Sequence, residues 1–120
     1  FLADRYGSKS SPYGRVSNWV IGNEINNQLW NYMGPMSLES YINEYQRAFR
    51  VFYTAIRSTS QSSRVFFSTD YNWMHEADGS LTYNAKDLLD AFNNQMIPGG
   101  SMGISISSVL DSVNGTGILE

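Results

Sequence analysis

The residue best placed to do chemistry is Glu24, which follows Asn23 directly at the end of a short apolar run, residues 19–22. An apolar run of this length, bounded by glycine and asparagine, predicts a buried strand over residues 15–22. Because an unpartnered carboxylate is costly to bury, we expect Glu24 at the end of the strand, facing a cleft. There it is a candidate catalytic acid. The alternative is that it caps the next segment or pairs with an arginine such as Arg15.

A second apolar run, residues 64–70, also ends in polar residues and predicts a second strand. It brings Asp70, Trp73 and His75 to the same kind of position as Glu24. Asp70 can contact a substrate or orient His75, or it can cap its own loop. His75 can hydrogen-bond a sugar hydroxyl. Because it is the only histidine and the chain has no cysteine, we expect no metal site and no other cofactor.

The segment between the first strand and the following helix, residues 23–35, is predicted to be a loop rich in amides and aromatics, including Asn27 and Trp30. Loops of this composition are common sugar-binding surfaces, although the same residues can cover a core. The flat faces of Trp30 and Trp73 can stack on pyranose rings, while tryptophan also serves often as a large core residue.

Composition narrows the class of protein. The chain has 120 residues, a formal net charge of −3 and 42% hydrophobic residues, which suits one globular unit with a modest core. The weakly acidic balance gives no electrostatic reason to expect nucleic acid or an anionic membrane as a partner. No apolar stretch approaches the roughly 20 residues of a membrane span.

Hydrophobic spacing predicts the helices. Apolar residues recur three and four positions apart between residues 38 and 57, after the candidate N-cap Ser37. We expect the following side chains on the buried face: Leu38, Tyr41, Ile42, Tyr45, Phe49, Phe52 and Ile56. A further helix begins near Asn84, with Asp87 three residues on, and buries Leu88, Leu89, Phe92 and Met96.

The order of the elements predicts the fold class. A helix end at residues 1–6 precedes strand, helix, strand, helix and a third strand at residues 102–107. Strands that alternate with helices predict a parallel sheet. A sheet of three such units has exposed edges and is a poor fold on its own. We therefore expect an α/β fold, a partial (β/α)8 TIM barrel spanning residues 1–120 as a fragment of a longer chain. Residues 108–120 carry little pattern.

Several segments together resemble a known superfamily. They are residues 14–19 and 21–26, the tyrosine-rich helix 41–53, and Ser68-Thr69-Asp70 with Trp73. In these segments the chain is similar to the superfamily of glycoside hydrolase (β/α)8 barrels whose acid/base glutamate follows an asparagine at the end of the fourth strand. It resembles most a group of largely uncharacterised bacterial barrel domains in that superfamily. The resemblance covers roughly residues 1–100, and it makes the three predicted strands the fourth to sixth of the barrel.

The resemblance implies a retaining hydrolase of polysaccharides or oligosaccharides, with Glu24 as general acid/base and Asn23 bonded to the sugar 2-hydroxyl. It places the nucleophile on the seventh strand, outside this chain, so the fragment alone is expected to be inactive. It implies the rest of the barrel as a partner for closure. The location of the protein stays open, with a secreted or cell-surface bacterial protein favoured over a cytoplasmic one. Residues 107–115 lack the aromatic, histidine- and proline-containing stretch of the resembled group. The alternatives are a barrel domain that binds carbohydrate without cleaving it, and a structural or interaction domain.

Overall fold

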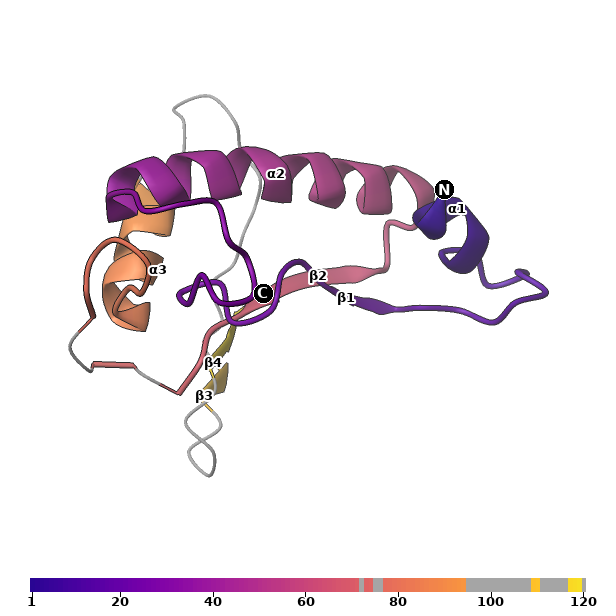
Figure 1. The fold of residues 1–120 in the computed structure, drawn as a ribbon. Coiled ribbons are helices and arrows are strands. Elements are labelled where there is room, and N and C mark those ends of the chain that lie inside the picture. The colour runs from indigo at the N-terminus through magenta and orange to yellow at the C-terminus, as the bar shows by residue number, and fades with distance from the viewer. Residues whose placement is uncertain (72, 75–76, 95–108, 111–116, 120) are drawn as a thin grey trace.

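The computed structural model describes residues 1–71, 73–74, 77–94, 109–110 and 117–119 (Figure 1). Their helices are α1 (Leu2–Tyr6), α2 (Leu38–Thr59) and α3 (Ala85–Asn94). Their strands are β1 (Asn18–Val20), β2 (Arg64–Ser68), β3 (Val109–Leu110) and β4 (Gly117–Leu119). In this part of the chain no helix is long and apolar enough to cross a membrane.

The centre of the fold is a strand–helix–strand unit. β1 pairs in parallel with β2, with Trp19 opposite Val65, and α2 connects the two strands (Figure 1). The hydrogen bond from the Ile21 amide to the Phe66 carbonyl continues the ladder one residue beyond β1. The parallel pairing expected of the first two strands is confirmed.

The other edge of β2 pairs antiparallel with β4, and β4 pairs antiparallel with β3, giving the order β1-β2-β4-β3. The third strand expected at residues 102–107 and the expected core residue Met96 lie outside the described residues. Two parallel strands are too few to test the closure of a barrel, so the partial (β/α)8 barrel stays a prediction.

The long helix α2 begins where its sequence predicts. The Ser37 hydroxyl accepts a hydrogen bond from the Ser40 amide at 3.3 Å and caps the N-terminus. Glu39 lies in the first turn and Arg57 in the last, as the helix dipole favours. The Arg57 guanidinium also donates to the Ser63 carbonyl at 3.0 Å, which secures the turn into β2.

The core lies between α2, β2 and α3. The side chains buried there from these elements are Tyr41, Ile42, Tyr45, Phe49, Ile56, Val65, Phe67, Leu88 and Phe92. Phe52 was expected on this face but is 51% exposed. Tyr53 packs against the core instead, with its ring 6.4 Å from that of Phe49. One residue of helix is a rotation of about 100°, so the buried stripe reaches Tyr53 and misses Phe52.

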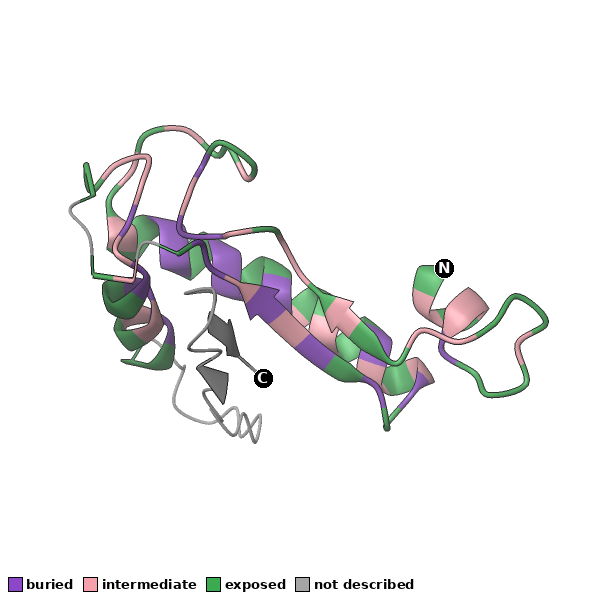
Figure 2. Ribbon diagram, turned by 90° about the horizontal axis from the view of Figure 1, so that it is seen from below, coloured by how far each residue is buried: buried purple, intermediate pink, exposed green. Residues whose placement is uncertain are grey.

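The expectation that Val20 is buried with Trp19 and Ile21 is wrong, because Val20 is 57% exposed. Trp19 and Ile21 pack against the core, and side chains alternate along a strand, so Val20 points to the opposite face of the sheet. Buried and half-buried residues alternate along β2 in the same way (Figure 2). Helix α2 covers one face of the β1–β2 pair.

Helix α3 begins at the expected cap. The Asn84 side-chain oxygen accepts hydrogen bonds from the amides of Lys86, at 3.0 Å, and Asp87, at 3.4 Å. Leu88 and Phe92 are buried against α2 as expected, whereas Leu89 is partly buried.

A tight loop precedes α3 and is organised by Asp78. One carboxylate oxygen of Asp78 accepts hydrogen bonds from the amides of Ser80 at 2.7 Å, Leu81 at 2.6 Å and Thr82 at 2.9 Å. These backbone donors favour the charged carboxylate and lower the pKa of Asp78 to about 2.

The core packing predicts a contrast between two phenylalanines. Phe92→Ala should lower the free energy of unfolding by about 3–5 kcal/mol, because it leaves a cavity among the rings of Tyr45, Phe49 and Phe67. Phe52→Ala, at the exposed position, should cost less than about 1 kcal/mol. Urea unfolding followed by near-ultraviolet circular dichroism measures both. Equal losses would contradict the assignment of Phe92 to the core and Phe52 to the surface.

The Asp78 loop predicts a dependence on pH. Because the folded pKa of Asp78, about 2, lies below the ordinary aspartate pKa of 3.8, its charge stabilises the fold fully above about pH 4. That contribution should fade as the pH falls toward 2. The free energies of unfolding of the wild type and Asp78→Asn should therefore differ at pH 6 and converge near pH 2. A difference that is independent of pH would show that the charge of Asp78 does not hold the loop.

Candidate active site

Glu24 stands just beyond β1, where the chain turns sharply. Gly22 has a φ of +83° and Glu24 a φ of +45°, both in the left-handed region. A side chain at Gly22 would be strained for two reasons. This φ is unfavourable for residues other than glycine, and the added Cβ would lie 2.8 Å from Ile25 Cγ2. A non-glycine residue such as Glu24 keeps this conformation only where its surroundings hold it, and such residues gather at functional sites.

Three hydrogen bonds hold Glu24, one of them from the Asn27 amide to its carbonyl at 2.8 Å. The Glu24 amide donates to the Ser68 hydroxyl at the end of β2, at 3.0 Å, and the Trp30 indole N–H donates to its carboxylate Oε2 at 2.8 Å. The residue is partly buried. Its carboxylate therefore lies at the carboxyl end of a strand, outside the core, where the sequence places it.

The two asparagines predicted to bind substrate, Asn23 and Asn27, differ in their surroundings. Asn23 is exposed, and its carbonyl accepts a hydrogen bond from the Asn31 side chain. Asn27 is partly buried, and its side-chain oxygen accepts from the Leu29 amide at 3.0 Å. Asn23 is thus the one whose side chain lies at the surface beside Glu24, while Asn27 shapes the start of the loop.

The loop that carries Trp30 is fixed by Gln28. Gln28 is 1% exposed, and its Nε2 donates to the Tyr83 hydroxyl at 2.9 Å and the Ser80 carbonyl at 3.1 Å. Its Oε1 accepts from the Met33 amide at 2.9 Å, on the far side of Trp30. Trp30 itself is 60% exposed, so it is not a core residue of the described chain.

Asp70 is buried, with 5% of its surface exposed. Its carboxylate accepts from Asn26 Nδ2 at 2.6 Å, and its amide donates to Asn26 Oδ1 at 2.8 Å. Asn26 Nδ2 also donates to the Tyr83 carbonyl at 3.2 Å. These contacts favour the loop-holding alternative for Asp70 over direct contact with a substrate.

The other two predicted site residues follow β2. Trp73 is partly buried, and its carbonyl accepts from the Lys86 amide at 3.2 Å, which joins the loop to the start of α3. His75 lies outside the residues that the structure describes. Within the described chain, no cluster of three or more histidine, cysteine or carboxylate residues could hold a metal ion.

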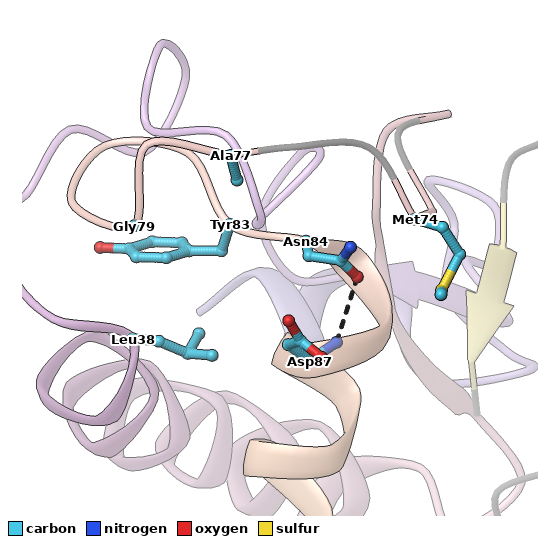
Figure 3. Close-up of a pocket in the computed structure, with 7 residues that line it drawn as sticks. All are labelled: Leu38, Met74, Ala77, Gly79, Tyr83, Asn84 and Asp87. Atoms are coloured by element: carbon cyan, nitrogen blue, oxygen red, sulfur yellow. Dashed lines mark hydrogen bonds between the residues drawn. The ribbon is translucent and has the colours of Figure 1, made fainter.

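A cavity of about 300 Å³ lies beside the starts of α2 and α3 (Figure 3). It is lined by Leu38, Met74, Ala77, Gly79, Tyr83, Asn84 and Asp87. Of the residues expected to bind substrate, none that the structure describes lines it. The hydroxyl of Tyr83 is engaged by Gln28 and by the carbonyls of Met36 and Ser80, so this residue offers the cavity a ring surface.

Sequence reasoning missed three residues that build the site: Ser68, Asn26 and Gln28. Each is a polar side chain whose partner lies far along the chain, with Ser68 44 positions from Glu24. The available signal was the change from apolar to polar residues at the end of the second strand, which marks Ser68 as the last residue before the loop.

The Asn26–Asp70 pair predicts a coupled stability effect. Asp70→Ala should lower the free energy of unfolding by about 2–3 kcal/mol, because it removes a buried charged acceptor and leaves the Asn26 amide short of a partner. Asp90→Ala is the control, since its ion pair with Lys86 is exposed and worth less than about 1 kcal/mol. A double-mutant cycle with Asn26→Ala should show coupling of about 1–3 kcal/mol. Additive losses would contradict the pairing.

Comparison with known proteins yields one match. No curated protein and no solved structure matches the chain. A family model described as a family of unknown function, DUF5722, matches residues 1–108. Because this match spans most of the chain, the protein belongs to the DUF5722 family.

Proposed function

We propose that this chain is part of a retaining glycoside hydrolase of the (β/α)8 barrel type, acting on a polysaccharide or oligosaccharide. The observation that carries the proposal is the placement of Glu24. Glu24 is a partly buried residue just past a parallel strand, it has a left-handed backbone conformation, and one oxygen of its carboxylate is held by the Trp30 indole. Barrel enzymes display catalytic groups at this end of their strands.

In the proposed mechanism Glu24 acts twice. It first donates a proton to the glycosidic oxygen as the bond to the leaving group breaks, and then removes a proton from the water that releases the sugar. Asn23, exposed beside it, would hydrogen-bond the 2-hydroxyl of the sugar being transferred. A retaining enzyme needs a nucleophilic carboxylate about 5–5.5 Å from the acid. Since Asp70 is buried against Asn26, we assign that nucleophile to chain beyond these 120 residues.

A second candidate is a barrel domain that binds glycans without cleaving them. It is favoured by the exposed aromatics of the two loops that follow β1 and β2. Trp30 is 60% exposed, Tyr32 71% and Tyr71 68%. Exposed aromatic faces bind sugars whether or not a catalytic carboxylate is present. In a third candidate, a structural or interaction domain, the bond from Trp30 merely satisfies Glu24.

Glu24→Gln in the full-length protein tests the acid/base role. The wild type is first assayed on a panel of 4-nitrophenyl glycosides and on xylan, mannan, β-glucan, arabinan and galactan. The variant should lose about 10²–10⁴-fold in kcat on the substrate that is cleaved, because a glutamine amide transfers no proton. Binding of that oligosaccharide, measured by quenching of tryptophan fluorescence, should change by less than about twofold.

The control is Glu44→Gln, since Glu44 lies on the outer surface of α2, paired with Arg47, and should leave turnover unchanged. Added azide should partly restore turnover of an aryl glycoside by Glu24→Gln, because azide attacks the glycosyl-enzyme without a general base. Unchanged turnover in Glu24→Gln would refute the acid/base role. A wild-type protein that binds sugar but cleaves none would favour the binding domain. A wild-type protein that neither binds nor cleaves sugar would favour the structural domain.

A further inference from the structure

We propose that Trp30 is both the positioning residue for Glu24 and the platform on which the leaving-group sugar stacks. The inference rests on the proposed function, and it assigns Trp30 to the subsite of the leaving-group sugar. It assigns the site to glycosides whose leaving group is itself a sugar, in preference to those with a small alkyl or aryl leaving group.

A hydrogen bond joins the two side chains. The Trp30 indole N–H donates to Glu24 Oε2 at 2.8 Å. This hydrogen bond fixes the rotation of the carboxyl group, and it strengthens when Glu24 has given up its proton. Among the described residues no hydrogen bond reaches the second oxygen, Oε1. Oε1 is therefore the atom that carries the proton to and from the reacting groups.

Both ends of this hydrogen bond are held in place. On one side the Glu24 amide is bonded to Ser68 at the end of β2. On the other side, the loop is tied down before and after Trp30. The Leu29 amide donates to Asn27, and the Met33 amide donates to the buried Gln28. A donor fixed in this way orients its acceptor without losing much conformational entropy when substrate binds.

The ring of Trp30 is exposed. Trp30 keeps 60% of its surface exposed although its indole nitrogen is engaged, so much of the ring is open to solvent. The acid of a retaining hydrolase donates its proton to the oxygen that joins the departing group. A ring bonded to that acid lies within a few ångströms of the departing group. The geometry points to a sugar on the leaving-group side, with its apolar C–H face on the indole.

The opposing interpretation is that Trp30 only shields Glu24. A shielding tryptophan would be largely buried, as Tyr83 is at 3% exposure, and it would have neighbours over its ring. The adjacent Leu29 is 78% exposed, so the loop places two apolar side chains in solvent at this point. The 60% exposure of Trp30 is therefore not explained by shielding of Glu24.

Trp30→Phe in the full-length protein tests the positioning role, because phenylalanine keeps a ring and lacks the N–H. The two probes are the disaccharide that the wild type cleaves and the 2,4-dinitrophenyl glycoside of the same sugar. On the disaccharide kcat/KM should fall about 10- to 100-fold. On the dinitrophenyl glycoside it should change by less than about twofold, since that leaving group departs without a proton.

Trp30→Ala tests the platform. It should reproduce the loss of Trp30→Phe and also raise KM for the disaccharide by about 2- to 10-fold, while KM for the dinitrophenyl glycoside stays unchanged. The matched control is Leu29→Ala, which removes an exposed side chain from the same loop and should match the wild type on both probes. Circular dichroism confirms that each variant is folded.

The outcomes separate this inference from the proposed function. Equal losses on both probes would mean that Trp30 only supports the fold, and wild-type kinetics in both variants would mean that it has no role. Either result overturns the inference, while the effect of Glu24→Gln still decides the acid/base role. A wild-type protein that cleaves no glycoside refutes both proposals.

Discussion

The site depends on the burial of Asn26. Its side chain accepts from the Asp70 amide and donates to the Asp70 carboxylate and the Tyr83 carbonyl, while its own carbonyl accepts from the Tyr83 amide at 2.8 Å. β1 and β2 stop pairing just before this point, so the strand ladder cannot hold the segments that follow. Asn26 takes over that role with four hydrogen bonds in a dry environment, where each is worth more than in water. The loops after β1 and β2 are thereby fixed to one another.

The turn at Gly22 and Glu24 lets adjacent residues face opposite ways. Ile25 is fully buried, and its carbonyl accepts from the Tyr41 hydroxyl at 2.6 Å. The Tyr45 hydroxyl likewise donates to the Ile21 carbonyl. Burial raises the pKa of Tyr41 to about 12, so its hydroxyl remains a donor throughout the physiological range. Helix α2 thus anchors the backbone on both sides of the turn, and Glu24 is held outside the core by the burial of its neighbour.

Sequence patterns predicted the elements whose signal is local. The spacing of apolar residues and the caps Ser37 and Asn84 place α2 and α3, because these depend on residues a few positions apart. The exposure of Val20 was not predictable in this way, since it depends on which face of the sheet α2 covers. The position of Glu24 was predicted, whereas its partner Ser68 and the burial of Gln28 were not. A polar side chain can be recognised from the sequence as a core residue only when its distant hydrogen-bond partners are known.

The open face of the sheet bears on how the site would be completed. Val20 and Phe66 are register partners, and both are more exposed than the neighbours that point toward α2. Strands in parallel sheets are normally covered on both faces, so an exposed valine and a half-exposed phenylalanine side by side mark a face made for packing. In the proposed barrel that face is the interior, and Glu24 lies just past its rim. The side chains that cover Val20 and Phe66 would then come from the strands that also bring the nucleophile, so that closing the core and completing the site would be the same event.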